Sequence, residues 1–135
     1  MNQEILRYDS NLSAADREIC QVLTEEIDKA LPESKSKIWH GSPVWFINDN
    51  PIVGYSKLKH GVQLLFWSGQ SFEEVDLKPV GNFKAAEVLY TAASEIGIDQ
   101  LSRWLKKSIG VQWDYKNIVK RKGELTRLKE EDHGT

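Results

Sequence analysis

Apolar residues recur at helical spacing early in the chain, between residues 14 and 31. At 100° per residue, one face of this segment carries Ile19, Val22, Leu23, Ile27 and Ala30. Cys20 lies at the flank of this face. Ser13 lies just before the segment and Asp16 follows three residues later, which resembles a capping box. Pro32 ends the pattern. The sequence therefore predicts a helix over residues 14–31, preceded by a polar lead-in over residues 1–12.

The pattern changes between residues 37 and 67, where short apolar runs are separated by turn residues. The runs predict strands over residues 37–40, 44–47, 52–59 and 62–67, and a further strand over 84–91 closes the sheet. Asn48-Asp49-Asn50-Pro51 and His60-Gly61 have the composition of tight turns. We interpret the stretch as a run of antiparallel strands, followed by a loop over residues 68–81.

A helical stripe returns near the C-terminus. It predicts a helix over residues 100–109, capped by Asp99 and broken at Gly110. A second helical piece is expected over residues 112–122, and the charged tail from residue 123 to 135 is expected to be a frayed helix or disordered. The buried stripe of the first piece contains Leu101, Trp104, Leu105 and either Ser108 or Ile109.

The order of these elements predicts the fold class. We expect one α+β domain over residues 1–122, with an N-terminal helix, an antiparallel sheet of about five strands, and a C-terminal helix or helix pair packed on the sheet. The length of 135 residues is enough for one such domain to bury a core.

The strands lack the alternation of apolar and polar residues that a sheet with one wet face shows. All four residues of 44–47 are apolar. In residues 62–67, one face carries Val62, Leu64 and Phe66, and the other carries Gln63 with Leu65 and Trp67. The predicted helices cover one face. Something else is expected to cover part of the second: the 112–122 segment, a second copy of the chain or a ligand.

Composition places the chain among soluble globular proteins, with 40% hydrophobic and 28% charged residues. No window approaches the roughly 20 apolar residues of a membrane-spanning helix. The N-terminus has no basic start followed by an apolar core, so no secretory signal is expected. The single cysteine, Cys20, cannot form an internal disulfide, which favours a reducing, cytoplasmic location and a buried structural thiol.

Charge is spread unevenly along the chain. Residues 1–34 carry three basic and eight acidic groups, a net charge of −5, whereas residues 103–122 carry seven basic groups and one acidic group, a net charge of +6. The basic segment, with Trp113 and Tyr115, is a candidate for contact with nucleic acid. The overall pI of 5.9 argues against general affinity for phosphate, so a solvated surface is the favoured interpretation.

Motifs of catalysis are missing from the sequence. It contains no CxxC, HExxH, GxGxxG, GxxxxGK[ST] or GxSxG pattern, so an enzyme is not the favoured class. His40 is the best candidate for ligand binding or proton transfer, with a structural role as the alternative.

Candidate ligand-binding residues gather in and after the strand-rich stretch. Its aromatic side chains can line a small-molecule pocket and its lysines can supply positive charge, although packing in the core is the alternative for most of the aromatic residues. The candidates are Trp39, His40, Pro43, Trp45, Lys57, Trp67 and Lys84.

Three strings of the sequence, IWHGSPVWF, NPIVGYSKLKHGVQLLF and GNFKAAEVLYTAASEIGIDQLSRWLKK, resemble the YdhG-like domain, a bacterial domain of unknown function. The resemblance covers roughly residues 14–109 and implies a fold of helix, antiparallel sheet and helix. The residues that match the bend, hairpin and strand entry of that family are Trp39, Gly41, Pro43, Lys57, Gly81 and Lys84.

One branch of that family is described as frataxin-like iron chaperones. The resemblance therefore implies iron held by surface carboxylates, which suit a hard cation. The weak candidates here are Glu25, Glu26, Asp28, Glu73, Glu74 and Asp76.

Three hypotheses follow. The favoured one is a cytoplasmic, non-enzymatic binding module that uses the sheet face for a small ligand or a protein partner, including a second copy of itself. The alternatives are a frataxin-like iron chaperone and a nucleic-acid accessory protein acting through residues 103–122.

Overall fold

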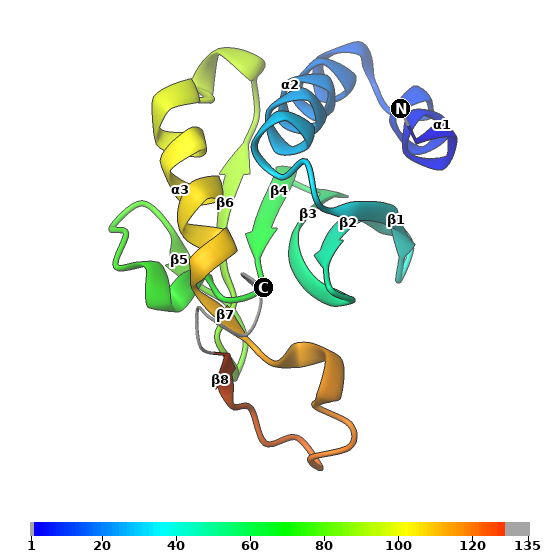
Figure 1. Ribbon diagram of the computed structural model, residues 1–135. Helices are drawn as coiled ribbons and strands as arrows, with labels where there is room; N and C mark the ends of the chain where they lie inside the picture. The colour runs from blue at the N-terminus through cyan, green and yellow to red at the C-terminus, as the bar shows by residue number, and fades with distance from the viewer. Residues whose placement is uncertain (1, 129–135) are drawn as a thin grey trace.

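The computed structural model describes residues 2–128 and has an α+β architecture built on one six-stranded antiparallel sheet (Figure 1). Its helices are α1 (Gln3–Ser10), α2 (Ala14–Ala30) and α3 (Ile98–Gly110). The strands of the sheet are β1 (Lys35–Trp39), β2 (Ser42–Ile47), β3 (Asn50–Leu58), β4 (Gly61–Phe66), β5 (Lys78–Pro79) and β6 (Ala86–Tyr90). A second, two-stranded sheet contains β7 (Gln112–Trp113) and β8 (Arg127–Leu128). Three short 3-10 helices are η1 (Gly69–Phe72), η2 (Ala93–Glu95) and η3 (Tyr115–Asn117). The predicted class is confirmed, and the arrangement differs from the prediction at both ends.

Two helices precede the sheet, where the sequence predicted one helix behind a polar lead-in. The predicted helix is confirmed as α2, and the Ser13 side chain caps it by accepting a hydrogen bond from the backbone N–H of Asp16. The prediction of a lead-in without a helix is wrong, because Asn2 caps α1 with its side chain. Ile5 of α1 is buried in the core, in agreement with the expectation that it packs against the body of the protein. A helix of eight residues depends on such packing for its stability.

The main sheet has the strand order β1-β2-β3-β4-β6-β5. Its first four strands follow one another as a meander, as predicted, because tight turns join them. His40 and Gly41 connect β1 to β2 with positive φ angles, and Asn48 and Asp49 connect β2 to β3 in the same way. The edge strand β5, which was not among the five predicted strands, lies in the segment that was predicted to be a loop.

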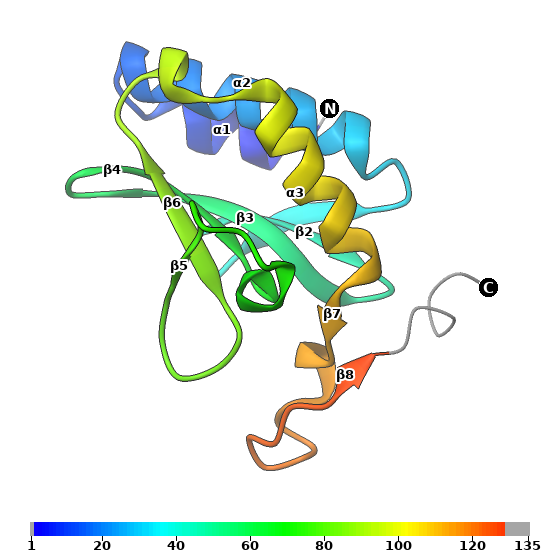
Figure 2. The ribbon, with the colours of Figure 1, turned by 90° about the vertical axis from the view of Figure 1, so that its left-hand side faces the viewer.

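All three α-helices lie on one side of the main sheet (Figure 2). The prediction that Val62, Leu64 and Phe66 share a face is confirmed, since all three are fully buried and Phe66 packs against Trp104 of α3, with 6.1 Å between the ring centroids. Trp45 of β2 faces the same side and donates its indole N–H to α2. The hydrophobic core therefore lies between the helices and one face of the sheet.

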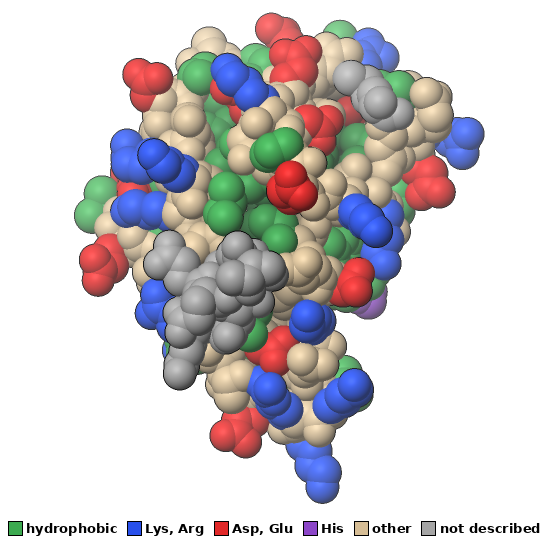
Figure 3. Space-filling view, viewed as in Figure 1, with side chains coloured by type: hydrophobic (Ala, Val, Ile, Leu, Met, Phe, Trp, Pro, Cys, Tyr) green, Lys and Arg blue, Asp and Glu red, His purple; other side chains and the backbone are tan. Residues whose placement is uncertain are grey.

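No second α-helix follows α3 in the described part of the chain, so the helix predicted over residues 112–122 is wrong, and only the short 3-10 helix η3 forms within this range. The chain instead forms a projecting loop between β7 and β8, on which Lys and Arg side chains gather (Figures 1 and 3). The buried Asp114 carboxylate pairs with Arg121 at 2.9 Å and accepts hydrogen bonds from Asn117, and its backbone N–H donates to Thr126. A continuous helix would place Asp114 and Arg121 about 10 Å apart along its axis.

The ends of α3 and of the tail also differ from the predictions. Gly97, not Asp99, is the N-cap of α3, and Asp99 lies in the first turn. Residues 127–128 of the predicted tail form β8, and residues 129–135 lie outside the described residues. Within residues 2–128, no helix combines the length and apolar character needed to cross a membrane.

A polar cluster lies inside the core where α1, α2 and β3 meet. Tyr55 donates its hydroxyl hydrogen to Asp9 at 2.7 Å, and the Thr24 hydroxyl lies 3.0 Å from the Tyr55 oxygen. Burial raises the pKa of the Asp9 carboxyl, and the hydrogen bond from Tyr55 offsets part of this effect. Burial also raises the pKa of the nearby Cys20 thiol to about 12, which supports a structural role for Cys20.

We expect Asp9→Asn to increase the free energy of unfolding by about 1 kcal/mol at pH 7. The amide keeps an oxygen for the Tyr55 hydroxyl and removes a charge that burial disfavours. Because the pKa of Asp9 is raised in the folded protein, the wild type loses stability as the pH rises above the ordinary carboxyl value of 3.8. Urea denaturation at several pH values measures this. A variant that is less stable than the wild type at pH 7 would contradict it.

Candidate functional site

An open groove lies on the face of the sheet opposite the three helices. It encloses a volume of about 140 Å³ between side chains of β1, β2, β3 and β4. An apolar cavity of roughly this size accommodates one benzene ring. The groove therefore has room for a single small planar group, not for a whole ligand of drug size.

The pairing of the strands determines which side chains reach this face. Successive residues of a strand point to opposite faces, so Gln63 and Leu65 point away from the core that their neighbours in β4 form. The register places Ser56 opposite Gln63 and Gly54 opposite Leu65. At the other side of the groove, Trp39 lies opposite Ser42.

Gly54 forms the floor of the groove. A Cβ atom at this position would lie 2.6 Å from the Pro43 carbonyl oxygen and 3.3 Å from a ring carbon of Trp67. Glycine is therefore required here for space, because any side chain would collide with the Pro43 carbonyl oxygen and crowd the Trp67 ring.

The aromatic side chains of the groove form a continuous group. The Trp39 and Trp67 ring centroids are 6.0 Å apart, and the Trp39 ring lies 5.4 Å from that of Phe46. His40 is exposed in the turn after β1, and its ring lies 4.3 Å from that of Trp39. Trp39 and Trp67 are both half-buried, so part of each ring faces solvent.

The five tryptophan side chains fall into two groups, according to whether the indole N–H donates a hydrogen bond to another residue. Trp45, Trp104 and Trp113 each donate to a side-chain oxygen, at 2.8, 3.0 and 3.0 Å. Within residues 2–128, Trp39 and Trp67 have no acceptor for this group, and neither nitrogen atom is buried. The two tryptophans of the groove therefore hold indole N–H groups that no other group within residues 2–128 accepts.

Three polar side chains that line the groove are engaged in hydrogen bonds with other side chains. Ser56 donates to the Ser42 hydroxyl at 2.8 Å, and Gln63 donates to the Glu87 carboxylate at 2.6 Å. The His40 ring makes no hydrogen bond or ion pair with any residue of the described chain. No side chain with a permanent charge lines the groove.

The groove brings together four of the seven predicted ligand-binding residues: Trp39, His40, Pro43 and Trp67. The other three lie elsewhere. Trp45 is buried under the helices. Lys57 pairs with Asp16 at 3.0 Å, and the Lys84 ammonium lies 4.6 Å from the centroid of the Trp113 ring.

Sequence reasoning missed the middle of the groove, namely Ser42, Val44, Gly54, Ser56, Gln63 and Leu65. A hairpin signal in the sequence could have located part of this set, but the predicted turn at His60-Gly61 lies one residue too late. Lys59 and His60 alone connect β3 and β4, and a two-residue connection fixes the register of a hairpin. Counting back from that turn places Ser56 opposite Gln63.

The carboxylates proposed as metal ligands are distributed over two elements. Glu25, Glu26 and Asp28 lie on α2, where Asp28 accepts the indole N–H of Trp45 at 2.8 Å. Within residues 2–128, no group of three or more His, Cys, Asp and Glu side chains is placed to hold a metal ion. Iron binding therefore stays a prediction from the family resemblance.

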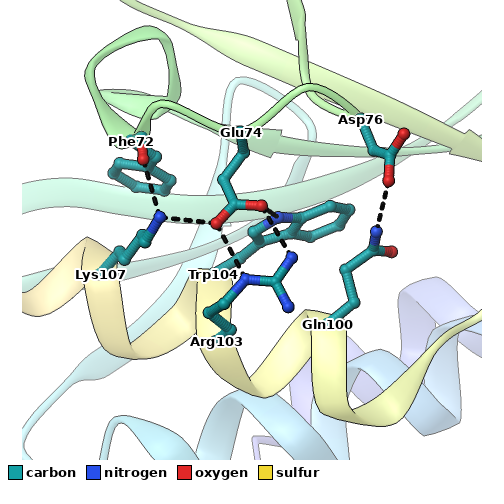
Figure 4. A network of polar contacts seen from close by, with 7 residues as sticks. All are labelled: Phe72, Glu74, Asp76, Gln100, Arg103, Trp104 and Lys107. Atoms are coloured by element: carbon teal, nitrogen blue, oxygen red, sulfur yellow. Dashed lines mark hydrogen bonds and ion pairs between the residues drawn. The ribbon is translucent and has the colours of Figure 1, made fainter.

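The remaining three carboxylates, Glu73, Glu74 and Asp76, lie in the loop after η1. Glu74 accepts two hydrogen bonds from Arg103, at 2.9 and 2.8 Å, and one from Lys107 at 2.6 Å (Figure 4). These partners hold the pKa of Glu74 well below its ordinary value. Asp76 accepts from Gln100 of α3 at 2.7 Å (Figure 4). Two of the three carboxylates thus fasten the loop to α3.

Several basic residues of the 103–122 segment have intramolecular partners. Arg103 and Lys107 pair with Glu74, Arg121 pairs with Asp114, and Lys116 donates to the backbone oxygen of Asn48 at 3.0 Å. The contacts of Arg103, Lys107 and Lys116 fix the segment to the body of the protein, and the Arg121–Asp114 pair lies within the segment. Nucleic-acid binding through it stays a prediction.

Comparison of the chain with protein-family models, curated proteins and solved structures finds no match. The resemblance to the YdhG-like domain therefore stays a prediction from its motifs, and the functional argument depends on the geometry of the groove.

Proposed function

We propose that this chain is a non-enzymatic binding module that holds a small planar group of a ligand in the groove on the open face of its sheet. The free indole N–H groups of Trp39 and Trp67 carry the proposal. Three tryptophans use this donor to fasten parts of the fold together, whereas the two that line the groove have no acceptor for it within residues 2–128. A ligand with an acceptor atom supplies the partner that the fold does not.

The lining of the groove indicates the chemistry of the group that enters it. Half-buried indole rings offer stacking surface to a planar group, while Ser42, Ser56 and Gln63 add hydroxyl and amide atoms at its edge. Because the lining has no permanent charge, the entering group is itself uncharged. An aromatic heterocycle with acceptor atoms on its edge fits these conditions.

The arrangement of the polar residues favours binding over catalysis. The two serines bond to each other, and the His40 ring has no carboxylate partner within residues 2–128. A nucleophile needs an adjacent base, and a base of this kind is usually oriented by a third group. The groove therefore supports recognition of a ligand without a reaction.

The indole N–H resonances in a ¹⁵N–¹H correlation spectrum provide the test. We expect titration with adenosine, nicotinamide or quinoline to shift the resonances of Trp39 and Trp67 for at least one compound. Those of Trp45, Trp104 and Trp113 should stay in place, because their donors are already bonded within the fold.

The variant Trp39→Ala should abolish the shift of Trp67, whereas Trp113→Phe, outside the groove, should preserve it. A spectrum unchanged by all three compounds at millimolar concentration would reject the proposal. A dilution series without ligand tests the alternative that a second copy of the chain, and not a ligand, covers this face. Concentration-dependent shifts of Trp39 and Trp67 would show that a second copy of the chain covers the groove.

A further inference from the structure

We infer that the ligand of this groove also carries an anionic group, a carboxylate or a phosphate ester, which Lys35 and Lys37 bind beside the aromatic rings. This inference rests on the proposed function, because the aromatic groove positions the rest of the ligand. Four observations support it: the alternation along β1, the contacts of Phe46, the lack of partners for the two lysines, and the position of Glu87.

Strand alternation places the two lysines on the same face as the groove. Lys35, Lys37 and Trp39 are every second residue of β1, so their side chains project to one side at intervals of about 6.6 Å. The register confirms this placement, because Lys35 lies opposite Phe46, two residues along β2 from Val44 in the groove lining. The lysines thus extend the groove along the edge of the sheet.

Phe46 connects the lysines to the groove. Its ring centroid lies 5.4 Å from that of Trp39, and the Lys37 ammonium lies 4.8 Å from the centre of the Phe46 ring. A second hollow of about 290 Å³ lies here, lined by Lys35, Lys37, Phe46 and two further residues. A ligand whose planar group lies against Trp39 can therefore reach the ammonium groups with a linker of a few atoms.

Neither lysine is neutralised by the fold. Within residues 2–128, no carboxylate oxygen lies within 4.0 Å of either ammonium group, in contrast to Lys57 and Lys107, which pair with carboxylates. Asp49 is the one acidic residue in the lining of the second hollow, so the hollow keeps a net positive charge. Such a site attracts an anion.

The opposite side of the groove lacks this net positive charge, because Glu87 of β6 lies opposite Lys78 of β5 in the register. Glu87 of β6 accepts a hydrogen bond from Gln63 at 2.6 Å and lies beyond β4 from the lysines. Repulsion by this carboxylate disfavours an anionic group on that side. The two sides together give the ligand one orientation, with its anionic group toward β1.

Matched pairs of compounds that differ only in the anionic group test the inference. Adenosine is compared with adenosine 5′-monophosphate, and 3-(3-pyridyl)propanol with 3-(3-pyridyl)propionate, in calorimetric or NMR titrations at low salt. We expect at least one anionic member to bind about tenfold more tightly than its neutral partner, and this preference to shrink at 0.5 M NaCl. The phosphate and carboxylate pairs show which anion the lysines select.

Charge variants show whether these two lysines are responsible. The double variant Lys35→Gln/Lys37→Gln should lose the preference while it still binds the neutral member. Lys29→Gln/Lys59→Gln changes the net charge equally at two exposed positions outside both hollows and should keep the preference. Equal affinities for both members of each pair, or a preference that survives in the Lys35/Lys37 variant, would overturn the inference and leave the proposed function intact. Failure of every compound to bind would remove the proposed function and the inference with it.

Discussion

Replacement of Trp104 by alanine is expected to lower the free energy of unfolding by about 4 kcal/mol. Trp104 is fully buried on α3, where its ring packs edge-on against Phe66 of the sheet at 6.1 Å. Its indole N–H also donates to Glu74 at 3.0 Å (Figure 4). The substitution removes the largest side chain that joins α3 to the sheet and leaves a cavity that the surrounding backbone cannot fill.

Trp39→Ala is the matched control, since it deletes the same side chain at a half-buried position of the groove. We expect it to cost about 1 kcal/mol, because solvent already reaches part of the Trp39 ring. It should nevertheless abolish the ligand-induced shift of Trp67. Guanidinium denaturation and NMR titration of both variants measure the two effects. Equal destabilisation by the two substitutions would show that Trp39 is a core residue. It would remove the main support for ligand binding in the groove.

Local signals in the sequence predicted most of the fold. The apolar stripes of α2 and α3 are long enough to dominate their surroundings, and the turn residues after β2 and β3 predicted the meander of β2, β3 and β4. The second turn nevertheless consists of Lys59 and His60, and not of His60 and Gly61 as predicted. The predictions were wrong where contacts between residues far apart in the sequence determine the secondary structure. In α1, the Asn2 side chain caps the helix and also donates to the Ser36 backbone oxygen of β1 at 2.8 Å, a contact between residues far apart in sequence.

The wrong prediction of a helix over residues 112–122 has the same explanation. Trp113, Ile118 and Val119 suggest helical spacing, but the buried Asp114 pairs with the Arg121 guanidinium, which a continuous helix would move about 10 Å away along its axis. Val119 is 86% exposed, so the apolar residue that suggested a buried stripe is not part of the core.

The candidate site was predicted only in part because the sequence does not show directly which face a strand residue occupies. Trp39 and Trp45 belong to one short stretch, yet Trp39 lines the groove and Trp45 is buried under α2. The two-residue turn at His40–Gly41 pairs Trp39 with Ser42, which places Trp45 on the opposite face. The free indole N–H groups could not be foreseen, because the acceptors of the other three tryptophans come from distant segments.

Glu74→Gln is expected to lower the free energy of unfolding by about 2 kcal/mol at pH 7. The Glu74 side chain is only 8% exposed and its carboxylate accepts hydrogen bonds from Arg103, Lys107 and Trp104 (Figure 4). The amide cannot bind both cations. Arg103 and Lys107 have side chains that are 51% and 36% exposed, so water solvates them in the variant and the loss stays below that of a fully buried ion pair.

The stability that Glu74→Gln loses relative to the wild type should decrease as the pH falls. The pKa of Glu74 is held below its ordinary value of 4.5, so the folded protein binds fewer protons there than the unfolded chain does. The stabilisation by Glu74 is therefore present above about pH 4.5 and disappears as the pH falls toward the lowered pKa, which brings wild type and variant together in acid. Urea denaturation from pH 7 to pH 2.5 follows this convergence. The neighbouring Glu73→Gln, at an exposed position, should change stability by less than about 0.5 kcal/mol at every pH. A constant difference between the wild type and Glu74→Gln across this range would show that the Glu74 contacts act through packing and not through charge.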